Sequence, residues 1–170
     1  ETDPDATLRM RHFRTHRLPA AGPSPTADRT PLAFNRDVAI SIAFPQGMDD
    51  FFYRNSQGDE IVFAAEGAGT LESSFGALPF RAGDYVVIPR GVLHCWRLAK
   101  GPFRFLVIES AGDVRTPKHY RNEHGQLTES APFSERDIRR PEAVEPRDET
   151  GDFPVVDSIL EVVAGLLPAS

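Results

Sequence analysis

Cysteine is almost absent from this chain, because Cys95 is the only one in 170 residues. An intrachain disulfide and a zinc cluster built on several cysteines are therefore both excluded. The sequence also contains no apolar run of membrane-spanning length, and its first residues lack the pattern of a secretory signal. These absences predict a protein of the reducing cytoplasm that has no membrane partner.

Positive charge is the scarcer sign, with 19 Lys and Arg against 25 Asp and Glu and a net charge of −6. A chain with this balance repels the phosphate backbone, so we expect no nucleic-acid partner. The exception is a basic cluster near the N-terminus, which consists of Arg9, Arg11, His12, Arg14, His16 and Arg17. Such a cluster could touch nucleic acid, but the acidic whole favours a solvated arm along the barrel or a partner subunit.

Proline and glycine are plentiful, with 15 and 13 residues, and they favour short strands over long helices. The chain is long enough for one domain with a sizeable core. Runs typical of strands alternate with turn residues and cover residues 31–34, 38–44, 51–53, 60–65, 70–74, 78–80, 85–88, 93–98 and 103–109. This pattern predicts an all-β sandwich or a double-sheet barrel.

Composition divides the chain into four segments. Residues 1–30 read as an extended N-terminal arm and residues 31–112 as the barrel. Residues 113–153 are rich in charge and proline and read as a second arm or linker. Residues 154–170 carry apolar side chains at helical spacing, which predicts a short amphipathic helix. Because its apolar stripe needs cover, we expect a homo-oligomer.

Two titratable residues stand out within the barrel. Glu60 opens an apolar strand, and His94 lies on another strand that follows the turn at residues 89–91. Pairing of these strands would bring both side chains to the inside of one barrel, and alternation along the strand sends Trp96 to the same side as His94. The pattern therefore predicts a pocket that contains a carboxylate and an imidazole.

The spacing of these residues resembles the two signature motifs of the cupin superfamily. The matching positions are Gly47, Glu60 and Gly67 in the first motif and Gly83, Pro89, Gly91 and His94 in the second. Tyr53 and Asn55 stand where the first motif has two histidines, and Leu98 replaces the final asparagine of the second. The resemblance implies a cupin jelly-roll barrel, in agreement with the strand pattern.

Two longer stretches resemble the first cupin half of bacterial homogentisate 1,2-dioxygenases. They read FFYRNSQGDEIVFAAEGAGTLESSFGALPFRAGDYVVIPRG and HYRNEHGQLTESAPFSERDIRRPE. Members of that family cleave the aromatic ring of homogentisate with Fe(II) and O2 and hold the iron in a second cupin half through His, Glu and His. We do not find the segment with those ligands in this chain. The resemblance implies an oxidoreductase acting on an aromatic acid, but it assigns no catalytic residue.

One interpretation of the pocket is a non-haem Fe(II) site in this barrel. Such a site needs two imidazoles and one carboxylate, with open positions for O2 and substrate. Glu60 and His94 supply one group of each type, and Trp96 and Arg54 are expected beside them. The weaker candidates for the missing ligand are Tyr53, Asn55, His119 and His124.

The other interpretation is a non-catalytic cupin module with a degenerate metal site, which binds a small ligand or mediates assembly. Tyr53 and Asn55 favour it because they replace metal-binding histidines. Glu60 would then form an ion pair inside the barrel, and the arginines that could provide it are Arg54, Arg90 and Arg97. His94 would be a buried histidine bonded to Glu60 or Tyr53.

Overall fold

Glycine, proline and small polar residues divide the chain into short strands. The computed structural model describes residues 10, 12–143 and 150–157. The strands are β1 (Thr30–Phe34), β2 (Val38–Ala43), β3 (Phe52–Arg54), β4 (Asp59–Glu66), β5 (Ala68–Ser73), β6 (Gly76–Arg81), β7 (Tyr85–Ile88), β8 (His94–Leu98), β9 (Arg104–Ser110) and β10 (Val155–Asp157). Three short helical turns are η1 (Thr15–Arg17), η2 (Lys118–Tyr120) and η3 (Glu135–Asp137). Within the described residues no helix is long and apolar enough to cross a membrane.

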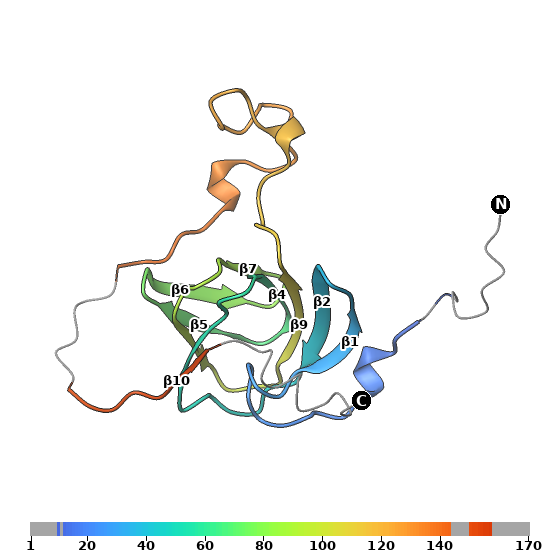
Figure 1. Cartoon of the computed structure of the whole chain (residues 1–170), viewed down its shortest axis with the longest axis vertical. Helices are drawn as coiled ribbons and strands as arrows, with labels where there is room; N and C mark the ends of the chain where they lie inside the picture. Colours follow the sequence, from blue (N-terminus) through green and yellow to red (C-terminus); the bar gives the residue numbers. More distant parts are fainter. Residues whose placement is uncertain (1–9, 11, 144–149, 158–170) are drawn as a thin grey trace.

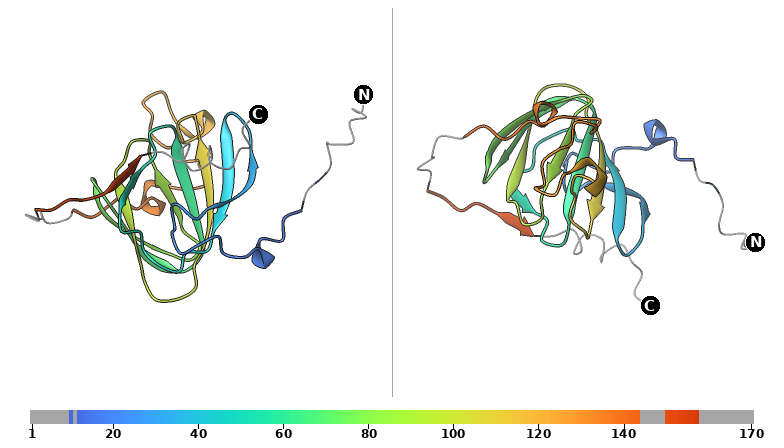
Figure 2. Two further views of the ribbon diagram at one scale, coloured as in Figure 1. Left: turned by 60° about the horizontal axis from the view of Figure 1, so that its bottom comes forward. Right: turned by 90° about the horizontal axis from the view of Figure 1, so that it is seen from above.

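The strands form two sheets that face each other (Figures 1 and 2). The first sheet has the order β1-β2-β9-β4-β7, and the second has the order β10-β3-β8-β5-β6. β10 runs parallel to β3, whereas the other neighbouring pairs are antiparallel. Strands distant in sequence, such as β2 and β9, lie side by side, which is the topology of a jelly roll. The predicted all-β jelly-roll barrel is confirmed.

The predicted strands all occur, with ends that shift by at most two residues. Residues 155–157, the first part of the segment assigned to a C-terminal helix, form β10. Val155 and Val156 are β-branched, and they pair in register with Phe52 and Tyr53 of β3. The rest of the predicted helix, residues 158–170, lies outside the described residues.

The core lies between the inner faces of the two sheets. Alternate residues of β4 and β9 point inward, so that Val62, Phe105 and Val107 are buried. Trp96 of β8 meets them from the second sheet, with its ring centroid 5.2 Å from that of Phe105 and 5.3 Å from that of Phe80. This apolar filling occupies the middle of the barrel, where Ser41 is a buried polar exception, and the buried Glu60 and His94 lie towards one end.

The segment after β9 leaves the barrel and projects away from it before it returns at residue 142 (Figure 1, gold and orange). The return point is a two-residue bridge in which the amides and carbonyls of Ala77 and Glu142 bond reciprocally at 2.7 and 2.9 Å. Arg139, which shortly precedes Glu142 in the chain, forms an ion pair with Asp84. The predicted second arm therefore lies partly against β6.

Two turn glycines differ only in their surroundings. Gly67 and Gly83 have φ of 99° and 93°, but a Cβ at Gly67 would lie 2.1 Å from the Phe103 ring, whereas one at Gly83 meets nothing within 4 Å. We expect Gly67→Ala to lower the free energy of unfolding by about 3 kcal/mol and Gly83→Ala by about 1 kcal/mol, since both add backbone strain and only the first adds a clash. Urea denaturation measures both losses. Equal losses would mean that Phe103 gives way at no cost.

Candidate functional site

Glu60 and His94 lie at the same end of the barrel, as predicted. Each stands at or near the start of its strand, β4 or β8, and each is 0% exposed. The register places Tyr53 of β3 opposite His94 and Glu109 of β9 opposite Glu60. The pocket is thus built by four strands from both sheets.

The partner of Glu60 is Arg29, the residue immediately before β1. Its Nη2 lies 3.1 Å from Glu60 Oε2 and its Nη1 lies 3.3 Å from Glu60 Oε1, so one guanidinium holds both carboxylate oxygens. The same Nη1 lies 3.3 Å from Oε1 of Glu109. The side chain of Arg29 is only 6% exposed. A buried ion pair of one cation with two carboxylates therefore occupies this end of the barrel.

Tyr53 and Asn55 complete the hydrogen bonding of Glu60. The hydroxyl of Tyr53 donates to Glu60 Oε1 at 3.1 Å, and the amide of Asn55 donates to the same oxygen at 3.0 Å and to Glu109 Oε2 at 3.2 Å. The carbonyl oxygen of the Asn55 side chain accepts from the backbone of Gln57 and Gly58, which fixes its orientation. Both residues are donors to the carboxylate in this arrangement.

A short segment before β1 holds Arg29 in place. The backbone carbonyl of Pro23 accepts from the amides of Gln46 and Gly47 at 3.0 and 3.1 Å, and the Ser24 hydroxyl bonds to Asp49. The carbonyl of Pro25, a fully buried residue, accepts from Arg29 Nε at 3.3 Å. The sequence assigned this segment to a solvated arm, because nothing in its local pattern signals that its arginine enters the barrel.

The charges determine the protonation of the pocket. Burial alone would raise the pKa of Glu60, but the charge of Arg29 and hydrogen bonds from Arg29 and Asn55 hold that pKa below its usual range. Burial raises the pKa of Glu109, an effect that Arg29 only partly offsets. Burial and the charge of Glu60 raise the pKa of Tyr53, whose phenol therefore stays protonated.

His94 makes a different bond from the one expected. Its Nδ1 lies 3.0 Å from the carbonyl oxygen of Val92, and its ring meets that of Tyr53 edge-on at 5.4 Å between centroids. Nε2 is buried and has no hydrogen-bond partner among the described residues. Burial lowers the pKa of His94, so the imidazole is neutral. The alternative of a bond to Glu60 or Tyr53 is not realised.

The three arginines named as partners of Glu60 pair elsewhere. Each forms an ion pair with a different carboxylate: Arg54 with Asp157 at 2.5 Å, Arg90 with Asp113 at 3.5 Å and Arg97 with Glu72 at 3.0 Å. Arg54 was also expected in the pocket, but its side chain is 43% exposed. Side chains alternate along β3, so Arg54 points away from the barrel while Tyr53 points into it.

The other predicted site residues divide into two groups. Trp96 is buried beside the pocket, with its ring centroid 6.4 Å from that of His94. His119 and His124 lie on the projecting segment, where both are exposed. His119 packs on Tyr120, and His124 lies 3.6 Å from Glu123. The structure does not bring these two histidines to Glu60.

The residues of this pocket do not fit Fe(II). The carboxylate expected to bind the metal has both oxygens engaged by Arg29, and Tyr53 stays a phenol. Among residues 10, 12–143 and 150–157, no three His, Cys, Asp or Glu side chains come together in a group that could hold a metal ion. Glu60 and His94 share the pocket but do not form a metal site with Arg29 in place.

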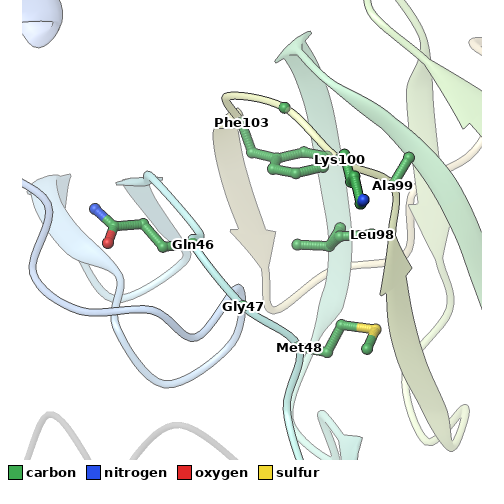
Figure 3. Close-up of a pocket in the computed structure, with 8 residues that line it drawn as sticks. Gln46, Gly47, Met48, Leu98, Ala99, Lys100 and Phe103 are labelled. Carbon is green, nitrogen blue, oxygen red and sulfur yellow. The ribbon is translucent and has the colours of Figure 1, made fainter.

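A second hollow, whose lining residues are drawn in Figure 3, lies beside Leu98, at the end of β8 opposite His94. It has a volume of about 310 Å³ and is lined by Gln46, Gly47, Met48, Leu98, Ala99, Lys100, Gly101 and Phe103. Leu98, the position of the missing motif asparagine, is one of its walls. Among the described residues, this lining contains one cation, Lys100, and no carboxylate.

The facing sheets, the motif spacing and a barrel pocket with Glu60 and His94 define a cupin. Within that class, the chain belongs to the family described as Homogentisate 1,2-dioxygenase N-terminal, whose family model matches residues 22–157. A protein of Saccharolobus solfataricus named as a candidate dioxygenase is 35% identical over 130 residues, which are 76% of this chain and 33% of that protein. The chain thus spans about a third of the length of that relative.

Solved structures with similar folds are more distant. A cupin-2 domain containing protein from Shewanella frigidimarina is 23% identical with a TM-score of 0.43, over 48% of this chain and 78% of that one. A candidate mannose-6-phosphate isomerase from Ralstonia eutropha is 20% identical with a TM-score of 0.49, over 60% of this chain and 98% of that one. Neither likeness bears on function.

The buried imidazole gives a pH dependence of stability that can be measured. The pKa of His94 is lowered by burial from 6.5. The unfolded chain therefore binds a proton at His94 at pH values where the folded chain does not. The free energy of unfolding consequently falls as the pH drops below the pKa that His94 has in the unfolded chain. We expect the free energy of unfolding to decrease between about pH 7.5 and pH 5.5, by at most about 1.4 kcal/mol per pH unit, and His94→Gln to abolish most of this decrease.

The control for this measurement is His124→Gln, since His124 has a side chain that is 74% exposed. This variant should keep the decrease of the parent chain. Urea denaturation at several pH values compares the three proteins. A decrease that survives in His94→Gln would show that another group carries it.

Proposed function

We propose that this chain serves as a structural cupin of a homogentisate 1,2-dioxygenase-type oxidoreductase, which opens an aromatic ring with Fe(II) and O2. In this proposal the barrel pocket around Glu60 does not carry out the chemistry. The observation that carries it is the guanidinium of Arg29 on both oxygens of Glu60. Family membership and the much longer relative named as a candidate dioxygenase support the link to that reaction.

The pocket residues then have a structural task. Glu60 of β4 binds Arg29 of the segment before β1 and Tyr53 of β3, and Arg29 also binds Glu109 of β9. Fe(II) and an aromatic acid substrate would be held by residues outside this set. We also propose a cytoplasmic location, with neither nucleic acid nor a membrane as partner.

A second role, in assembly, has its own supporting observation. Two rows of apolar side chains cross the outer face of the first sheet in register: Ile42, Leu106, Phe63 and Tyr85 in one row, and Ile40, Ile108, Ile61 and Val87 in the other. Tyr85 is 67% exposed and Val87 is 46% exposed. The rows are thus exposed at β7, whereas Ile42 at their other end is only 3% exposed. Exposed apolar side chains on β7 favour a homo-oligomer, in which a second copy of the chain covers them.

The iron content tests the first proposal. We expect the 170-residue chain to retain less than about a tenth of an equivalent of iron after anaerobic loading with Fe(II), and to consume no O2 with homogentisate, since its pocket lacks a vacant donor set. Plasma emission spectrometry and an oxygen electrode provide the readouts. The native protein that contains this sequence should bind iron stoichiometrically and consume O2, and Glu60→Gln in it should leave the iron content unchanged.

Two results would contradict this proposal. Stoichiometric iron and O2 uptake by the 170-residue chain would make its own pocket catalytic. A native protein without O2 uptake on homogentisate would remove the link to ring cleavage. Asp113→Asn is the matched control for Glu60→Gln, because it also removes one carboxylate charge but does so at the surface, where Asp113 pairs with Arg90.

The assembly proposal is tested by placing a charge on the apolar face. Val87→Lys should weaken self-association about tenfold or more, because a lysine opposite Ile61 would lose its hydration in the interface. Sedimentation equilibrium measures the dissociation constant. Phe75→Lys is the control, since Phe75 is 66% exposed at the turn between β5 and β6 of the other sheet. A parent chain that stays monomeric at all concentrations would refute a homo-oligomer.

A further inference from the structure

Every nitrogen of the buried Arg29 guanidinium has an acceptor. Nε donates to the carbonyl of Pro25, Nη1 to Glu60 and Glu109, and Nη2 to the other oxygen of Glu60. The guanidinium carbon also lies 5.6 Å from the centroid of the Tyr53 ring. The lining therefore presents two carboxylates, one backbone carbonyl and one aromatic ring to a single cation.

This lining matches the shape of a guanidinium as well as its charge. A carboxylate that accepts from both terminal nitrogens is the geometry of a planar, forked donor, which a lysine ammonium cannot reproduce. Two acids around one cation leave a formal excess of negative charge; burial is the main cause of the raised pKa of Glu109, and the charge of Glu60 adds to it. The pocket is thus organised for a flat cation with several N–H groups.

The donors that a divalent metal would need are arranged otherwise. His94 turns Nδ1 to the carbonyl of Val92, and its Nε2 finds no partner among the described residues. Tyr53 and Asn55 point hydrogen-bond donors at Glu60, so they compete with a metal for that carboxylate. The imidazole contributes nothing to the cation in the pocket.

We propose that the barrel is a guanidinium receptor, which its own Arg29 occupies, and that the pocket freed of this side chain binds small guanidinium ions in preference to divalent metals. The bound side chain fastens the segment from Pro23 to Arg29 to the barrel. This role does not depend on the ring-cleaving activity proposed above, because it requires no iron anywhere in the protein.

The test removes the side chain of Arg29 by substitution and supplies its guanidinium group as methylguanidinium in solution. Arg29→Ala should unfold at a lower temperature than the parent chain, and methylguanidinium at about 20 mM should raise its Tm by about 4 °C with saturation in the millimolar range. At this concentration the denaturing action of guanidinium salts is negligible. Differential scanning fluorimetry gives Tm, and isothermal titration calorimetry gives the stoichiometry.

Matched controls separate specific binding from general salt effects. Methylguanidinium should raise the Tm of neither the parent chain nor Arg54→Ala. Arg54 is the control because its side chain is 43% exposed. Equal concentrations of sodium chloride or urea should not stabilise Arg29→Ala. Glu60→Gln combined with Arg29→Ala should abolish the rise in Tm, because it removes the carboxylate that accepts from both terminal nitrogens of a guanidinium. A gain in that double variant would overturn the proposal.

Metal titration and a conservative variant provide independent outcomes. Stoichiometric binding of Zn(II) or Ni(II) by Arg29→Ala, without a response to methylguanidinium, would overturn the proposal and make the pocket a masked metal site. Arg29→Lys keeps the charge but lacks the fork, and we expect it to unfold at a Tm at least about 4 °C below that of the parent chain. An unchanged Tm in Arg29→Lys would show that only charge matters, even if Arg29→Ala failed to fold.

Discussion

A carboxylate that is completely removed from water needs a counter-charge, and the rest of this structure depends on how Glu60 obtains one. An isolated ionised carboxylate inside an apolar barrel would cost far more than a domain of this size can offset, so the group is either neutralised or paired. Arg29 supplies the pair and the low pKa that goes with it. Through this contact and its neighbours, residues of β3, β4 and β9 are linked to the segment before β1.

The same contact explains why a cupin barrel can keep its shape without metal chemistry. A metal ion supplies positive charge together with open positions for ligands, whereas a guanidinium supplies charge and uses its hydrogen bonds on the protein. Tyr53 and Asn55, at positions where the cupin motif has histidines, are suited to this substitution because they donate hydrogen bonds to Glu60. Tyr53 and Asn55 in place of the histidines, and Arg29 inside the barrel, therefore act together to satisfy Glu60.

The sequence predicted the parts of this arrangement that follow from local periodicity. Alternation and turn residues placed Glu60 and His94 at one end of a jelly roll, and the motif spacing identified Tyr53 as their neighbour. Arg29 could not be found in this way, because its entry depends on the conformation of a proline-rich segment and on acceptors distant in the chain. Glu109 was missed for a similar reason, since only the pairing of β4 with β9 puts it opposite Glu60.

β10 covers the edge of the second sheet, although it lies about a hundred residues beyond β3 in the chain. An uncovered sheet edge offers free amides and carbonyls to any other extended chain, which is a common origin of aggregation. The ion pair of Arg54 with Asp157 fastens β10 to that edge at the surface. Residues 122–125, between β9 and β10, are exposed. A protease that cut there would loosen the covering strand, so proteolytic nicking would make the protein prone to edge-to-edge polymerisation.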